Sequence, residues 1–299
     1  MTDLTRRSFL ATTAGVAAAR GGAWNPDRLG IACGFGTTET SVRTPLAAAR
    51  QAGFTRVQIQ IPWAKVSDSY IKSLPGWLAS EGVHAEVLGA YVNCAVPGNV
   101  LMDCRTEDFS RAIDVASALG ARRLAAWTGG YGRGLMTSDP RNFAPPAADA
   151  ICRFLDPFLK RLEQAHLALA LESYITLVCP DAPSLARLLK RLPPCVGAVL
   201  DPPNLTPVAR YRQRDQVLRE MLKLLRHRTA VVHLKDFRLA KSGSSYDLPG
   251  PLGGEMNYRL FVDGILKLPG DPPIMAEHLK PAEFAAARRS LLPLFAAAR

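Results

Sequence analysis

The sequence predicts an α/β protein that folds as a single (β/α)8 barrel. From Leu29 onward, short apolar runs alternate with helical patterns, which is typical of parallel strands joined by helical crossovers. Eight such units in 299 residues, 48% of them hydrophobic, fit one barrel of about 250 residues better than two ordinary domains. An open doubly wound sheet is disfavoured, because the first strand is followed only by Gly34-Phe35-Gly36 and not by a complete G-x-G-x-x-G motif.

The expected strands are short apolar runs bounded by polar, glycine or proline residues. They cover residues 29–35, 56–61, 85–92, 123–127, 167–171, 196–200, 230–233 and 273–276. The expected helices between and after them cover residues 44–51, 107–119, 147–165, 183–191, 213–226, 258–266 and 283–298. Asp108 with Ser110, and Asp181 with Ser184, stand where helix-starting residues are favoured, and they support two of these helices.

Residues 1–23 are expected to precede the barrel domain, which spans residues 24–299. Thr5-Arg6-Arg7-Ser8-Phe9-Leu10 resembles a twin-arginine export signal, and the weakly apolar residues 11–19 end in three alanines that suit a cleavage site. This predicts a periplasmic or secreted protein, or a cytoplasmic one if the arginine pair is accidental. No run of about 18 apolar residues occurs, so no membrane span is expected after signal removal.

The chain is basic, with 37 Lys and Arg against 26 Asp and Glu and a net charge of +11. Such a charge favours anionic partners, but an ordinary solvated basic face explains it equally well, since the basic residues are spread along helices. No block of basic residues is interleaved with aromatic residues, so nucleic acid is not a favoured partner. The six cysteines form no C-x-x-C pair, which argues against a zinc knuckle or a dithiol redox motif.

Four expected strands deliver a metal-binding type of side chain at the same end. Glu172 follows one strand, Asp201 the next, His233 ends a third, and Glu277 follows the last. The carboxyl ends of parallel barrel strands meet at one rim, so these residues are expected to surround one cation. Carboxylates with one imidazole suit Mn, Mg, Co or Zn. Taken singly, each residue has an ordinary alternative: a helix cap, an Asx turn, a core histidine or a rim ion pair.

The motifs at these strand ends resemble those of a known family. Leu-Glu-Ser at 171–173, Val-Leu-Asp-Pro-Pro-Asn at 199–204, Val-His-Leu-Lys-Asp at 232–236 and Ala-Glu-His at 276–278 resemble the metal-site strands of the sugar phosphate isomerase/epimerase group. That group belongs to the xylose isomerase-like TIM barrel superfamily, which is related to endonuclease IV. The segment 249–254 with Asn257-Tyr258 also resembles the group's loop before its last crossover helix.

The resemblance implies one divalent metal held by Glu172, Asp201, His233 and Glu277. It also implies that Glu172 and Glu277 are catalytic, moving a proton next to a sugar carbonyl through a metal-stabilised enediolate. The expected substrate is a small carbohydrate, and a homo-oligomer is compatible with the sequence. The expected substrate-binding residues are basic, amide, aromatic or imidazole side chains near the same rim: Lys235, Arg238, Asn204, Asn93, Trp63, Trp127 and His278.

Two departures leave the reaction open. Asn204 stands where many relatives carry a histidine, and no second glutamate follows Glu172 at the short interval that some ketose epimerases use. The alternatives are a keto-cyclitol dehydratase with the same ligands, an endonuclease IV-type nuclease and a non-catalytic carbohydrate-binding barrel. The five histidines of the chain are few for a nuclease with a trinuclear zinc site.

Overall fold

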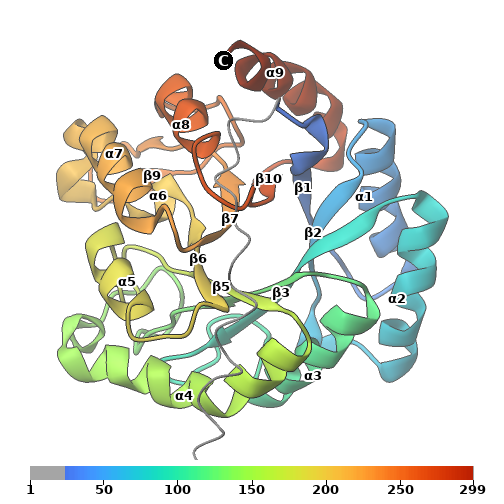
Figure 1. Cartoon of the computed structure of the whole chain (residues 1–299), viewed down its shortest axis with the longest axis horizontal. Helices are drawn as coiled ribbons and strands as arrows, with labels where there is room; N and C mark the ends of the chain where they lie inside the picture. The colour runs from blue at the N-terminus through green and yellow to red at the C-terminus, as the bar shows by residue number, and fades with distance from the viewer. Residues whose placement is uncertain (1–23, 299) are drawn as a thin grey trace, which may run out of the picture.

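The computed structural model describes residues 24–298 and contains a closed barrel of eight parallel strands surrounded by helices (Figure 1). The strand order around the barrel is β1-β10-β7-β6-β5-β4-β3-β2. Every neighbouring pair is parallel, including β1 with β10, which closes the ring. The predicted (β/α)8 fold is therefore confirmed. The expected export signal with Arg6 and Arg7 lies outside the described residues.

The eight barrel strands match the expected ones to within two residues at either end. They are β1 (Leu29–Gly34), β2 (Arg56–Gln60), β3 (His84–Asn93), β4 (Arg123–Trp127), β5 (Ala168–Glu172), β6 (Val196–Leu200), β7 (Thr229–Leu234) and β10 (Ile274–Ala276). A small antiparallel hairpin between β7 and β10 adds β8 (Arg238–Leu239) and β9 (Tyr246–Asp247).

One helix of at least eight residues follows each barrel strand and forms the outer ring in Figure 1. These helices are α1 (Glu39–Gln51), α2 (Asp68–Glu81), α3 (Thr106–Ala118), α4 (Pro145–Gln164), α5 (Ala182–Leu189), α7 (Arg214–Leu225), α8 (Tyr258–Ile265) and α9 (Phe284–Ala297). Shorter helical turns are α6 (Pro202–Leu205) and the 3-10 helices η1 (Pro26–Arg28), η2 (Trp63–Lys65), η3 (Pro140–Phe143), η4 (Val208–Gln213) and η5 (Pro281–Glu283).

Two helices differ from the expectation, and internal prolines explain both differences. Helix α2 was not expected because Pro75-Gly76 interrupts its pattern, although Ser67 caps its first turn and Gly82 ends it at φ +64. Helix α1 begins at Glu39, five residues before the expected start, and continues through Pro45. A proline inside a helix removes one backbone hydrogen bond, and packing of the buried face of each helix offsets that loss.

Successive strand residues belong to two different hydrophobic clusters, and this alternation determines whether a polar side chain points into or out of the barrel. In β5, Leu169 belongs to the cluster between barrel and helices, whereas Ala170 belongs to the cluster inside the barrel. Successive residues of a strand point to opposite faces, so Glu172 points inward like Ala170. In β7, His233 lies two residues after the inward-facing Val231, so its side chain also points into the barrel. The barrel interior therefore changes from apolar residues to charged ones toward its carboxyl end.

Within residues 24–298, no helix has both the length and the apolar character needed to cross a membrane.

Candidate active site

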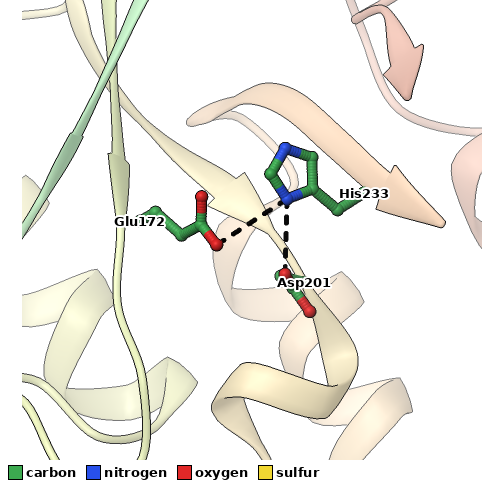
Figure 2. Close-up of side chains that lie close together, drawn as sticks. All are labelled: Glu172, Asp201 and His233. Atoms are coloured by element: carbon green, nitrogen blue, oxygen red, sulfur yellow. Dashed lines mark hydrogen bonds and ion pairs between the residues drawn. The ribbon is translucent and has the colours of Figure 1, made fainter. Parts of the chain in front are cut away.

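The four expected metal ligands converge at the carboxyl end of the barrel. The Nδ1 atom of His233 lies 3.3 Å from Asp201 Oδ2 and 3.3 Å from Glu277 Oε1. The same nitrogen lies 3.8 Å from Glu172 Oε1, and Figure 2 shows Glu172 and Asp201 pointing toward it. One ligand-type atom from each of Glu172, Asp201 and His233 falls within 4.8 Å of the others. The strand-end pattern thus produces one compact cluster.

Lys235 also belongs to this cluster, although the sequence indicated a substrate contact. Its Nζ atom lies 2.8 Å from Asp201 Oδ2 and 2.7 Å from Glu277 Oε1, and the side chain is only 3% exposed. Tyr258 donates a hydrogen bond of 3.0 Å to the carbonyl oxygen of Lys235 and so holds the end of β7. The lysine follows His233 by two residues and therefore shares its inward face. Its ammonium group is a partner of the carboxylates before any substrate is bound.

Asp201 caps a short helix with one carboxylate oxygen and faces the cluster with the other. Its Oδ1 atom accepts a hydrogen bond of 3.3 Å from the backbone N–H of Asn204 and caps α6. Its Oδ2 atom faces His233 and Lys235. Because the two oxygens have different partners, the short helix fixes the carboxylate without consuming the oxygen that points into the cluster.

Glu172 is held by two side-chain donors. Asn204 Nδ2 donates to Oε1 over 2.9 Å, and the Tyr91 hydroxyl donates to Oε2 over 3.0 Å. Asn204 was expected to contact the substrate, but in this structure its amide orients a predicted catalytic carboxylate. Both Glu172 and Asn204 are buried. The orientation of Glu172 is therefore set by the protein before substrate binds.

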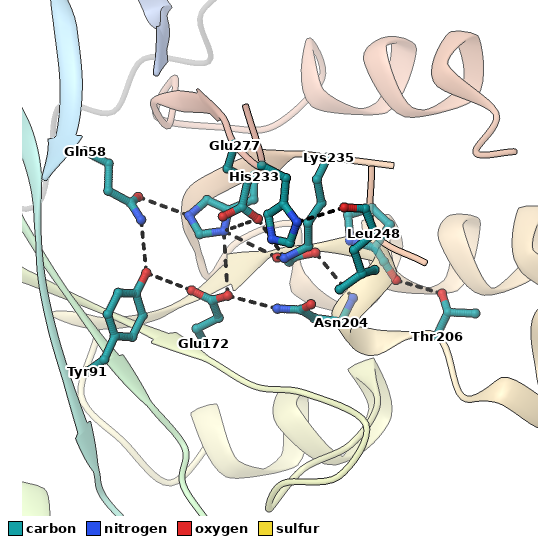
Figure 3. A network of polar contacts seen from close by, with 12 residues as sticks. Gln58, Tyr91, Glu172, Asn204, Thr206, His233, Lys235, Leu248 and Glu277 are labelled. Atoms are coloured by element: carbon teal, nitrogen blue, oxygen red, sulfur yellow. Dashed lines mark hydrogen bonds and ion pairs between the residues drawn. The ribbon is translucent and has the colours of Figure 1, made fainter. Parts of the chain in front are cut away.

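Gln58 and Tyr91 were missed by the sequence analysis. Gln58 Nε2 donates to the Tyr91 hydroxyl over 3.0 Å, and Gln58 Oε1 lies 3.0 Å from His233 Nε2. Figure 3 shows these side chains on the opposite side of His233 from Lys235. Both lie within strands, whereas the sequence motifs mark only residues at strand ends. The available signal was in β2, where Arg56, Gln58 and Gln60 alternate with apolar residues.

Burial and charge set the two glutamates apart. Burial raises the pKa of Glu172 to about 7, against the opposing effect of His233. Burial also acts to raise the pKa of Glu277, but the charges of His233 and Lys235 outweigh it and hold that pKa well below its usual value. For His233, burial acts to lower the pKa, while Glu277 and Glu172 together raise it well above its usual value. Glu277 is thus the better-stabilised anion of the two.

The donor set fits a divalent cation. Three carboxylates and one ammonium group leave two negative charges, which a divalent cation balances when the His233 imidazole is neutral. Glu277 Oε1 is buried and points into the cluster, where it lies 2.7 Å from Lys235 Nζ and 3.3 Å from His233 Nδ1. Oxygen donors with one imidazole nitrogen suit Mn, Mg, Co or Zn, as the sequence predicted.

A cavity of about 580 Å³ opens beside the cluster. Glu277 lines it, and Glu172 does not. His278, an expected substrate contact, also lines the cavity, with its Nδ1 atom 2.9 Å from the carbonyl oxygen of Leu248. The other polar residues of the wall are Gln58, Gln60, Tyr91, Lys280 and Glu283. Such a wall suits a hydroxyl-rich ligand of carbohydrate size.

Two expected substrate contacts have other partners. Arg238 lies on the exposed β8–β9 hairpin, 3.4 Å from Asp247 Oδ2, with half of its side chain exposed. Asn93 donates to the carbonyl oxygens of Asn99 and Gly130, and its own oxygen accepts from the N–H groups of Val96 and Gly130. These four hydrogen bonds use the capacity of the amide, so Asn93 fixes two rim loops.

Trp63 and Trp127, the two tryptophans expected to contact the substrate, are packed within the protein and do not border the cavity. Trp127 stacks at a tilt on Tyr91, with ring centroids 5.0 Å apart, and its Nε1 atom faces the sulfur of Met102 at 3.1 Å. Trp63 donates to the carbonyl oxygen of Gly89 over 2.8 Å. Neither lines the cavity. Aromatic residues at strand ends thus serve the rim packing here.

A first prediction concerns the metal. The purified protein is expected to retain one divalent ion per chain after dialysis, because the cluster brings together four side chains of metal-binding type with a matching charge. His233→Ala and Asp201→Ala should each lose most of it, since each removes a ligand. Elemental analysis measures the metal content, and His278→Ala is the matched control because this histidine lines the same cavity outside the cluster. Equal metal content in all four proteins would contradict the assignment.

Comparison with known proteins agrees with the fold. The model of a family described as Xylose isomerase-like TIM barrel matches residues 46–293. No curated protein sequence matches the chain. Among solved structures, a xylose isomerase-like TIM barrel protein from Mycobacterium smegmatis in complex with magnesium is 19% identical, with a TM-score of 0.67 over 88% of this chain and 90% of that chain.

Two further solved structures show that different activities share this fold. An L-ribulose 3-epimerase is 16% identical, with a TM-score of 0.68 over 91% of this chain and 95% of that chain. The mannonate dehydratase from Streptococcus suis serotype 2 is 12% identical, with a TM-score of 0.65 over 90% of this chain and 93% of that chain. Likeness at these identities establishes the fold and leaves the reaction to be argued from the site.

Proposed function

The chain belongs to the xylose isomerase-like TIM barrel family, and from its site we propose that it is a divalent-metal-dependent isomerase or epimerase acting on a sugar or cyclitol. The observation that carries this proposal is the pairing of Glu172 and Glu277 with His233 and Asp201 around one point. Solved structures of the same fold include an L-ribulose 3-epimerase and a D-tagatose 3-epimerase-like protein, which supports the reaction class.

The two glutamates are placed for proton transfer from different sides. They come from β5 and β10, which are separated by β6 and β7 around the ring. Glu277 borders the cavity as a stabilised anion, so its carboxylate is placed to remove a proton from the carbon next to a substrate carbonyl. Glu172 is buried behind the cavity wall, and in this proposal it returns a proton to the substrate. A bound divalent cation would supply positive charge that stabilises negative charge developing on substrate oxygens.

The site residues keep these groups in position. Asn204 and Tyr91 hold the carboxylate of Glu172, and the α6 turn holds that of Asp201. The cluster is closed on its inner side by the apolar barrel interior, which excludes water from that side. A preorganised pair of carboxylates costs little reorganisation during the reaction.

The nuclease alternative is less well supported. Of the four histidines other than His233, His84 begins β3 at the opposite end of the barrel, and His278 lies on the rim. Among residues 24–298, the cluster that can hold a metal contains His233 as its single imidazole. A trinuclear zinc site needs more nitrogen ligands than this arrangement supplies.

A solvent-exchange screen tests the proposal. The metal-loaded protein is incubated in deuterated water with ketoses, inososes and sugar phosphates, and NMR detects deuterium next to the carbonyl. Isomerised or epimerised product carrying deuterium is expected for one class of compound. A dehydrated product would instead establish the lyase alternative. Binding of a sugar with neither exchange nor product over the whole panel would favour the non-catalytic barrel.

We also propose that residues 1–23 direct twin-arginine export, from the order of the arginine pair, apolar stretch and alanines. Replacing Arg6 and Arg7 by lysine is expected to leave most of the protein uncut in the cytoplasm. Fractionation with immunoblotting measures this, and replacement of Arg20, which lies after the alanines, is the control. Export of the doubly substituted chain at the normal level would refute the signal.

A further inference from the structure

We propose that Gln58 and Tyr91 are positioning residues that determine which ring nitrogen of His233 faces the metal site. The inference rests on the proposed metal-dependent function and deepens it. Both residues come from strands on the far side of the barrel from β7, and neither is one of the expected ligands. Their contacts with the cluster are shown in Figure 3.

The side chains form a ring that consists of three hydrogen bonds and one longer ion-pair contact. The Tyr91 hydroxyl donates to Glu172 Oε2 over 3.0 Å, and Gln58 Nε2 donates to that hydroxyl over 3.0 Å. The other end of the Gln58 amide places Oε1 3.0 Å from His233 Nε2. His233 Nδ1 returns to Glu172 Oε1 at 3.8 Å. The ring thus links two expected metal ligands through two residues that are not ligands.

The direction of each hydrogen bond follows from the chemistry of the groups. An ionised Glu172 only accepts, so the single proton of the Tyr91 hydroxyl is used there. The hydroxyl oxygen must then accept, and only the amino end of the Gln58 amide can donate to it. This turns the amide oxygen toward His233, and an amide oxygen cannot donate. The Nε2 atom of His233 must therefore carry a proton.

The consequence for the metal site is a fixed imidazole. With a metal in the site the ring would be neutral, and a proton kept on Nε2 would leave the lone pair of Nδ1, the nitrogen 3.3 Å from Asp201 and Glu277, to the metal. All four members of the ring are buried, at 7% exposure or less. In such surroundings an unpaired donor or acceptor is costly, so alternative arrangements of the amide are strongly disfavoured. A hydrogen-bond partner on the second nitrogen of a metal-binding histidine orients the ring and increases its basicity.

The test compares Gln58→Met with Gln60→Met. Both replacements keep the side-chain length, and both positions line the same cavity from β2. Gln60 lies outside the ring, with its amide 3.9 Å from the sulfur of Met102. Gln58→Met is expected to weaken metal binding by about 10- to 100-fold in a calorimetric titration, the usual effect of losing such a partner. Gln60→Met is expected to bind metal as the wild type does.

Tyr91→Phe tests the second member. It is expected to weaken metal binding as well, because the Gln58 amide loses the acceptor that fixes its orientation. The double replacement should lose little more than Gln58→Met alone, since both residues act through one chain of hydrogen bonds. If the fold-losses of metal affinity in the two single replacements multiply in the double replacement, Tyr91 acts on Glu172 separately. That result would overturn the relay from Tyr91 to His233.

A second readout does not depend on the metal. In 15N-histidine-labelled protein, NMR is expected to detect a protected Nε2–H on His233 in the metal-free wild type, with only five histidines to assign. This proton should exchange rapidly with solvent in Gln58→Met and stay protected in Gln60→Met. A wild type that binds no metal but shows the protected proton would refute the proposed function and leave the positioning role supported. A protected proton and metal affinity unchanged in Gln58→Met would overturn the inference.

Discussion

Glu277→Gln is expected to lower kcat by about 100- to 10,000-fold on the substrate identified by the exchange screen, with a much smaller change in KM. Glutamine keeps the size of the side chain and one coordinating oxygen but cannot take a proton. Glu277 borders the cavity, and its Oε1 atom lies beside Lys235 and His233, whose charges hold it as an anion. The same replacement at Glu172 should give a loss in the same range, because the proton must also be returned.

The two variants are expected to differ in proton exchange. Glu277→Gln should stop exchange of the substrate's α-proton with solvent, because the carboxylate at the cavity wall is the one placed to remove it. Glu172→Gln should retain exchange while product formation falls, because removal of the proton does not need the second carboxylate. NMR in deuterated water measures both quantities in one experiment.

A matched control separates chemistry from a general loss of charge at the cavity. Glu283→Gln removes a carboxylate that lines the same cavity but lies on η5, outside the cluster. Its turnover is expected to stay within a few-fold of the wild type, and the metal content of all three variants is measured alongside. If Glu172→Gln and Glu277→Gln retain metal, substrate binding and near-normal turnover, the two glutamates are ligands only.

The sequence predicted the barrel and the four clustered residues because both depend on local patterns. Each strand is a short apolar run, and Glu172, Asp201 and Glu277 sit directly at strand ends, where the topology brings them together. The barrel closes β1 onto β10, so the order of strands along the chain already fixes the neighbours of each strand end. Among the helices of the outer ring, only α2 and the start of α1 were missed, at positions where proline interrupts the pattern.

The partners of these residues could not be predicted in the same way. Gln58 reaches His233 across 175 positions of sequence, and Tyr91 reaches Glu172 across 81. Asn93 and Asn204 were expected to contact the substrate, and only the coordinates show that both amides also have partners within the protein. A sequence motif indicates on which strand a residue lies and to which face its side chain points. The partners of its polar atoms depend on residues of other strands, which the motif does not contain.

Lys235→Met is expected to have opposite effects on stability and on metal binding. The ammonium group lies between Asp201 and Glu277 and is almost fully buried. Removing one partner of a buried ion pair leaves uncompensated charge and costs about 3–5 kcal/mol. Chemical unfolding of the metal-free variant measures this loss. Arg238→Met, which removes a basic residue from an exposed pair in the same stretch, should cost about 1 kcal/mol or less.

The metal affinity of Lys235→Met should rise, by about tenfold or more, because like charges that share two carboxylates repel each other. Saturating metal should therefore restore more stability to this variant than to the wild type, since a ligand that binds only the folded state stabilises it in proportion to its affinity. The comparison needs only unfolding curves with and without metal. A variant that loses both stability and metal affinity would show that Lys235 supports the shape of the site rather than competing for its charge.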